Sequence, residues 1–207
     1  MILTPIPHEQ LDAALDRFAG QLGDPAARAV FARIRATSPE RADGAAAETH
    51  RQQALALARH CGMAIHPAGT AAAFNWDGAA LDGATEAYVI LHEAAHFVLA
   101  PPERRRLVDF GLGPGPDTTE RAAAERAAIL PIPERDADEA AASLLGILWE
   151  AALGQPALAS FLDQNWLEGL ERSAAPHFTA MLRRLWRRGV VELPAAGELQ
   201  PSAREMR

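Results

Sequence analysis

The sequence predicts a mainly α-helical protein, α+β with a small β element, and three observations support this expectation. Apolar residues recur three and four positions apart through most of the 207 residues, which is the spacing of one helical face. Pro, Gly and capping residues separate these stretches. The composition, 49% hydrophobic and 23% charged, is that of a globular core. We therefore expect one domain over residues 1–192 and a disordered tail over 193–207.

The first third of the chain predicts three helices joined by short loops. Residues 8–22 carry an apolar face and stop at Gly23. Asp24 and Pro25 form a favourable cap and first-turn pair for a second helix, which ends near Ser38. The polar segment ERADGAAAETH then predicts a loop that leads into the third helix.

The third helix is expected to end at Cys61, and the segment after it is the place where strands are expected. Short apolar runs over residues 63–76 are broken by Pro and Gly there. Asp82 or Thr85 can cap the next helix. Beyond this point the pattern predicts only helices, over residues 88–100, 117–129, 133–154, 156–170 and 175–188.

Charge and cysteine content exclude several classes of protein. The net charge of −7 argues against nucleic acid as a partner of the whole surface. Cys61 is the one cysteine, so the chain predicts no internal disulfide and no multi-thiolate zinc site. The sequence shows no signal-peptide pattern and no apolar run long enough to cross a bilayer. We expect a cytoplasmic protein without membrane contact.

One apolar helix, YVILHEAAHFVLA, carries charged and polar groups in its middle. His92, Glu93 and His96 form the pattern H-E-x-x-H, which places both imidazoles one turn apart on the same face. Buried groups of this kind cost free energy unless a partner satisfies them. A metal ion is one such partner, with Glu93 offset to contact a metal-bound water. A pair of satisfied core histidines is the alternative.

A two-histidine site needs a third protein ligand, and the long helix that begins at Pro133 offers several carboxylates. Glu134 falls within the apolar stripe of that helix, so it is the expected third ligand. Asp138 lies one turn later and is expected to accept the N–H of a metal-bound histidine. A preference of acids for a helix N-terminus is the alternative explanation for both. Three further acids are expected to face solvent: Asp136, Glu139 and Glu150.

This pair of helices resembles the gluzincin metallopeptidases, in which H-E-x-x-H is followed by E-x-x-x-D. That resemblance implies a zincin-like helix pair, a zinc ion, and Glu93 as the general base that acts on zinc-bound water.

A longer segment resembles a different family. The residues from His92 to Asp117, HEAAHFVLAPPERRRLVDFGLGPGPD, are similar to the metal-binding segment of the elongation factor P hydroxylases. The shared features are His92, Glu93, His96, Ala100, Arg104-Arg105, Leu107-Val108-Asp109-Phe110-Gly111 and Pro116-Asp117. The resemblance implies a non-haem iron enzyme that hydroxylates a modified lysine on elongation factor P. His92 and His96 would then be iron ligands, with Glu134 as the carboxylate.

The chain departs from that family after its D-F-G, where Leu112-Gly113-Pro114 replace aromatic residues. The ligand set suits Fe(II), which the resemblance favours, and it suits Zn(II) as well. Three residues are candidates for the substrate side of the site: Arg105, Asp109 and Tyr88. Arg105 belongs to the run Arg104–Arg106, for which the alternatives are a docking patch for an acidic partner, a salt bridge to Asp109, and a solvated helix end where cations suit the dipole. Tyr88 lines the site or fills the core. The three hypotheses are an oxygen-dependent hydroxylase acting on a protein, a zinc metallopeptidase, and a metal-stabilised interaction module without catalysis.

Overall fold

The computed structural model describes residues 6–70, 72–115, 118–167 and 173–192, and these ranges are mainly helical. They contain eight α-helices: α1 His8–Gln21, α2 Pro25–Arg35, α3 Gly44–His60, α4 Ala87–Leu99, α5 Arg121–Ala127, α6 Ile132–Ala152, α7 Ala157–Asp163 and α8 Ala174–Arg187. Two short 3₁₀ turns, η1 Arg104–Arg106 and η2 Val108–Gly111, follow α4. None of the described helices is both long and apolar enough to span a bilayer.

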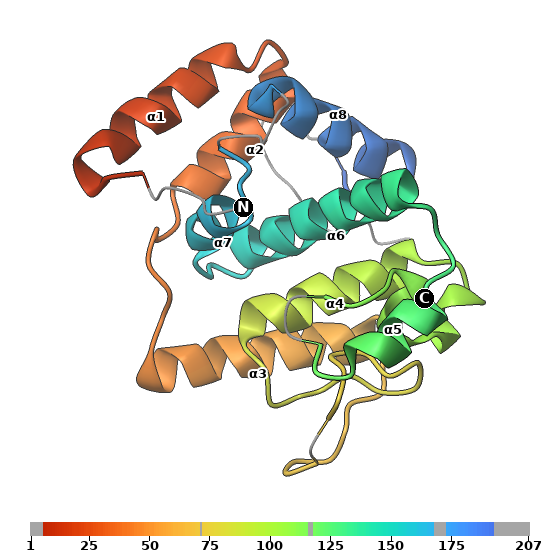
Figure 1. Ribbon diagram of the computed structural model, residues 1–207. Helices are drawn as coiled ribbons and strands as arrows, with labels where there is room; N and C mark the ends of the chain where they lie inside the picture. The colour runs from red at the N-terminus through yellow and green to blue at the C-terminus, as the bar shows by residue number, and fades with distance from the viewer. Residues whose placement is uncertain (1–5, 71, 116–117, 168–172, 193–207) are drawn as a thin grey trace.

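Helix α6 is the central element of the fold. It packs against α4 on one side and against α2, α7 and α8 on the other, while α3 covers the outer face of α4 (Figure 1). Every residue of α6 from Ala140 to Glu150 is buried as a result. The core above α6 is aromatic, because one buried cluster joins α1, α2, α7 and α8 through Phe18, Phe31, Phe161 and Phe178.

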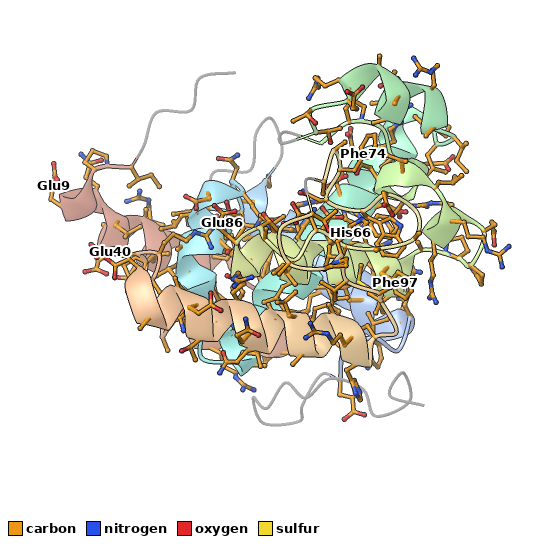
Figure 2. The ribbon with its side chains drawn as sticks, turned by 90° about the horizontal axis from the view of Figure 1, so that it is seen from below. Glu9, Glu40, His66, Phe74, Glu86 and Phe97 are labelled. Carbon is orange, nitrogen blue, oxygen red and sulfur yellow. The ribbon has the colours of Figure 1, made fainter. Side chains whose placement is uncertain are left out.

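The expected β element is reduced to two isolated bridges within the described ranges. Leu81 pairs with Ile65 in the parallel sense and with Trp76 in the antiparallel sense. Asp77 folds the chain back between these positions, because its carboxylate accepts from the backbone N–H groups of Ala79 and Ala80. A side-chain contact of 2.8 Å between His66 and Asp77 ties the same loop together (Figure 2 labels His66).

Most of the expected helices are present, and the boundaries differ for local reasons. Asp24 caps α2 as predicted, since its carboxylate accepts from the Ala26 N–H at 2.9 Å. Helix α3 begins at Gly44, inside the segment predicted as a loop. Helix α7 ends at Asp163, before residue 170, and Asn165 shortly after it has the positive φ that stops a helix. Helix α4 follows Glu86 instead of Asp82 or Thr85, and the predicted tail lies outside the described residues.

Close packing of α4 on α6 depends on a glycine. A Cβ atom built at Gly146 would lie 3.3 Å from both the Cα and the backbone N of His92. These neighbours are backbone atoms in the middle of a buried helix, so they cannot swing aside as a flexible side chain would. Gly146 therefore lets the helix that carries the two histidines approach α6 directly.

The substitution Gly146→Leu tests this close approach. We expect it to lower the free energy of unfolding by roughly 3 kcal/mol, because the added side chain pushes α4 away from α6. Gly20→Leu is the matched control, since Gly20 is a helical glycine with nothing within 4 Å of its Cβ position. Urea denaturation followed by circular dichroism measures both variants. A Gly146→Leu protein as stable as the Gly20→Leu protein would contradict the packing described here.

A second buried group on α6 is Glu150, which was expected to face solvent and is instead 2% exposed. Its carboxylate lies 3.4 Å from the Arg41 guanidinium, which also binds Ser160 and Asp163. Burial raises the pKa of Glu150 to about 7, and the contacts with Ser160 and Arg41 offset only part of that effect. The surface expectation fails because α6 is enclosed on all sides at this point.

The raised pKa of Glu150 predicts a pH-dependent stability. The folded state binds this proton more tightly than the unfolded chain, so its contribution is complete below the unfolded pKa near 4.5 and lost as pH rises through about 7. Glu150→Gln cannot lose this proton. The free energy of unfolding of the variant should therefore rise relative to that of the wild type by about 3 kcal/mol between pH 4.5 and 8. Thermal unfolding at a series of pH values measures this difference in stability. Glu9→Gln, at the exposed end of α1, is the control (Figure 2). Parallel profiles for wild type and Glu150→Gln would contradict the assignment.

Candidate metal centre

Helix α4 brings His92 and His96 together as the i,i+4 spacing predicts. Their Nε2 atoms lie 3.0 Å apart, with ring centroids separated by 4.6 Å and planes at 84°. His96 is 4% exposed, and His92 is half-buried. Phe110 stacks on the His96 ring at 5.5 Å and restricts its orientation. Both imidazoles therefore present the same nitrogen to one point in space.

Glu139 of α6 completes a group of three donor atoms. Its Oε2 atom lies 3.4 Å from Nε2 of His92 and 3.3 Å from Nε2 of His96. Burial acts to raise the pKa of Glu139, but the charges and hydrogen bonds of His96 and His92 outweigh it and hold this pKa well below its usual range. About half of the Glu139 side chain, 49%, remains accessible. The carboxylate is therefore ionised and reachable from solvent.

The spacing of these three atoms fits a shared metal ion. Two donors that are each about 2.1 Å from one ion lie roughly 3.0 to 3.4 Å apart at octahedral or tetrahedral angles. The three separations between His92, His96 and Glu139 are 3.0, 3.3 and 3.4 Å. Two nitrogens and one carboxylate oxygen are also the chemistry that Fe(II) and Zn(II) accept. The residues present therefore fit a divalent ion.

The third donor of the metal group is Glu139, whereas Glu134 was the predicted third ligand. Glu134 is exposed in the first turn of α6 and does not belong to it. Gly146 marks the face of α6 that touches α4, and Glu139 precedes it by two turns on the same face. Glu134 is rotated by about 140° from Glu139. The apolar stripe that pointed to Glu134 is only one of the buried faces of α6.

Small residues in the sequence mark the face of α6 that packs against α4. Ser143 and Gly146 follow Glu139 at intervals of four and seven positions, and both are enclosed where α4 and the cavity meet α6. A row of small side chains is where two helices approach closely, whereas large apolar residues gather on more distant contacts. The acid at the end of that row, Glu139, is the one that reaches the histidines.

Glu93 lies beside the group as the motif predicts, without belonging to it. Its side chain is 8% exposed, and Asn75 donates to its Oε1 at 3.4 Å. Burial raises the pKa of Glu93 to about 7, although the His92 charge opposes this. A carboxyl group with this pKa holds or releases a proton near neutral pH. Asn75 is a further site residue that no motif in the sequence indicated.

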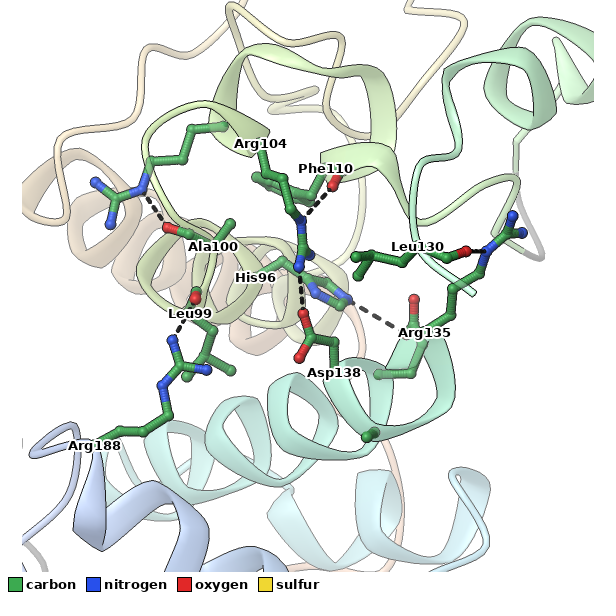
Figure 3. A network of polar contacts seen from close by, with 12 residues as sticks. His96, Leu99, Ala100, Arg104, Phe110, Leu130, Arg135, Asp138 and Arg188 are labelled. Carbon is green, nitrogen blue, oxygen red and sulfur yellow. Dashed lines mark hydrogen bonds and ion pairs between the residues drawn. The ribbon is translucent and has the colours of Figure 1, made fainter. Parts of the chain in front are cut away.

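Asp138 contacts two arginines instead of the histidine that was predicted. It lies between two guanidinium groups, 2.7 Å from Arg104 and 2.8 Å from Arg184 (Figure 3 shows the Arg104 contact). Arg104 is itself buried and also donates to the Phe110 carbonyl oxygen at 2.9 Å. Asp138 therefore joins α6 to α8 and to the η1–η2 segment, and the predicted hydrogen bond to a metal-bound histidine is not formed.

The three candidates for the substrate side differ in position. Arg105 caps the end of α4 by donating to the carbonyl oxygens of Ala100 and Val98, away from the site. Tyr88 and Asp109 both line the cavity in front of the metal group. The Arg41 guanidinium lies 3.7 Å above the Tyr88 ring and fixes it. Two of the three residues thus line the cavity, and Arg105 does not.

The cavity has a volume of about 1070 Å³ and reaches from the metal group to the start of α8. Trp166 and His177 form part of its far wall, stacked at 5.2 Å, and the Trp166 indole donates to Ser143 at 2.7 Å. Arg135 and Arg121 also line the cavity, next to Gly113 and Gly115 respectively. A ligand larger than water therefore has room beside the three donor atoms.

Comparison with protein-family models, with curated proteins and with solved structures found no match to this chain. Its chemistry is therefore inferred from the site itself. That site offers one divalent ion three protein donors, a buried carboxyl group close by, and a cavity on the open side.

Metal binding distinguishes Glu139 from Glu134. We expect the wild type to bind one Co(II) or Zn(II) ion, and Glu139→Gln to weaken binding at least roughly 100-fold, because a charged donor is lost from the group. Glu134→Gln removes the same charge from the same helix and should bind as the wild type does. Isothermal titration calorimetry measures all three proteins. Equal loss in both variants, or loss only with Glu134→Gln, would contradict the assignment.

Proposed function

We propose that this chain is a metal-dependent enzyme that hydroxylates a protein side chain with O₂ and a two-electron reductant, using an ion held by His92, His96 and Glu139. The observation that carries the proposal is the position of these three donors on the wall of a cavity large enough for a side chain. Three donors on one side leave several coordination positions facing that cavity. The resemblance of the segment His92–Asp117 to the elongation factor P hydroxylases supports the same chemistry.

The lack of an extended strand among the described residues favours a hydroxylase over a peptidase. An enzyme that cleaves an extended peptide commonly holds it as an added strand along a sheet edge. The part of the chain that the structure describes contains only the two isolated bridges at Leu81. The cavity beside the donors suits a single inserted side chain instead. Elongation factor P is the first protein substrate to test.

Residues of the chain would transfer protons, orient the metal-binding side chains and exclude water. Fe(II), when bound, supplies the capacity to activate O₂. Glu93 takes up or releases a proton at its carboxyl oxygen, and Asn75 orients that carboxyl group. Phe110 holds the His96 ring in place by stacking on it. Tyr88 and Trp166 give the cavity apolar walls that exclude water around an inserted side chain.

A zinc-dependent peptidase of the gluzincin type is the second candidate. The observation in its favour is Glu93, whose buried carboxyl group has a pKa of about 7, suited to a general base at neutral pH. In this alternative Glu93 would take a proton from the attacking water. A metal-stabilised interaction module without catalysis is the third candidate, and it shares the metal group with the other two.

Reconstitution with each metal separates these candidates. With Fe(II), O₂, a two-electron reductant such as ascorbate, and elongation factor P, we expect the substrate to gain the mass of one oxygen atom while the second oxygen atom leaves as water. Glu139→Gln should abolish this gain. With Zn(II), the peptidase alternative predicts cleavage of unstructured peptides that Glu93→Gln removes while zinc stays bound. Mass spectrometry detects both products. Zinc-dependent cleavage without oxygen transfer would overturn the hydroxylase, and neither activity with a large loss of melting temperature on chelation would favour the module.

A further inference from the structure

The segment after α4 contains an uncommon backbone conformation next to the metal group. Asp109, Phe110 and Gly111 have consecutive positive φ angles of 44°, 54° and 70°. A glycine adopts this left-handed region at no cost and an aspartate tolerates it, whereas for a large residue such as Phe it is a genuine outlier. Conformations of this kind persist only where surrounding contacts hold them, and they cluster at functional sites.

Contacts on both sides of the segment hold the left-handed turn. The Asp109 N–H donates to the Trp76 carbonyl oxygen at 3.0 Å, and Arg104 donates to the Phe110 carbonyl oxygen at 2.9 Å (Figure 3). The Phe110 ring is fully buried between the parallel ring of Trp76 at 5.5 Å and the ring of His96. These contacts hold Phe110 against a metal-group histidine, with Asp109 next to it in the chain.

The turn directs the Asp109 side chain to the cavity. Asp109 lines the cavity together with Glu93 and the three donors. The Thr118 hydroxyl donates to Oδ2 of Asp109 at 3.0 Å and accepts from the Gly115 N–H, so one carboxylate oxygen is tethered. Within the described residues, Oδ1 of Asp109 has no hydrogen-bond partner. Burial also raises the pKa of Asp109, and the hydrogen bond from Thr118 opposes this effect.

Asp109 is not one of the three grouped donors. The donor atoms of His92, His96 and Glu139 lie within 4.8 Å of one another, and Asp109 does not belong to that set. A carboxylate on the wall of the same cavity can accept a hydrogen bond from a water that completes the ion's coordination, when one oxygen is tethered and the other has no partner among the described residues. This position suits an outer group that orients such a water.

We propose that Asp109 is a positioning residue of the metal centre, held on its left-handed turn so that Oδ1 accepts a hydrogen bond from water on the ion. The assignment rests on the proposed metal group and adds to it a carboxylate that acts without ligating. It gives the left-handed turn a role, because this turn has Phe110 stacked on the His96 ring and Asp109 on the cavity wall.

Titration with Co(II) alone tests the role of Asp109, because visible absorption reports the geometry around this ion. Asp109→Asn keeps the left-handed turn, since Asn tolerates positive φ, and its carbonyl still accepts from Thr118. We expect this variant to bind one Co(II) with affinity lowered roughly 10-fold to 100-fold and with shifted absorption bands. Circular dichroism and thermal unfolding confirm that the variant is folded.

Asp136→Asn is the matched control, because Asp136 also lines the cavity and its substitution removes the same charge. It should leave the Co(II) spectrum unchanged. Three results would overturn the proposal: a spectrum and affinity for Asp109→Asn equal to those of the wild type, an equal effect of Asp136→Asn, or complete loss of binding by folded Asp109→Asn, which would make Asp109 a direct ligand. Failure of the wild type itself to bind Co(II) would instead refute the underlying metal group.

Discussion

The close contact between α4 and α6 is the constraint on which the rest of the structure depends. At Gly146 the two helices approach so nearly that the backbone of His92 occupies the space of a side chain. Only at this separation can a glutamate of α6 reach both imidazoles of α4, because its side chain spans just a few ångströms. The helix packing and the metal group are thus two consequences of the same small residue. Much of the surrounding fold buries the faces of these two helices.

A second set of contacts fixes the segment after α4 relative to this pair. Asp138 receives Arg104 from η1 and Arg184 from α8, so one carboxylate joins three parts of the chain. Arg104 extends the connection to the Phe110 carbonyl oxygen, and Phe110 meets His96. A mostly buried acid between two guanidinium groups is costly to disrupt, since the loss of one partner leaves unpaired charge behind. These contacts hold the cavity wall at a fixed position relative to the histidines.

The sequence predicted the helices and the histidine pair, because both depend on local spacing. The i,i+4 relation of His92 and His96 holds in any α-helix, and Asp24 caps its helix through neighbouring atoms. The third donor depends on which face of α6 meets α4, and the apolar stripe could not decide this for a helix buried on every side. The left-handed turn at Asp109 was equally out of reach, because Phe110 opposes its own backbone preference there and only tertiary contacts maintain it.

The donor atoms of α4 and α6 predict that one divalent ion is held between these two helices. A crystal structure of the protein grown with Co(II), with anomalous diffraction measured at the cobalt edge, tests it most directly. We expect one strong peak within bonding distance of Nε2 of His92, Nε2 of His96 and a carboxylate oxygen of Glu139. A peak bound by Glu134 or located elsewhere, or no peak at the two histidines, would contradict it.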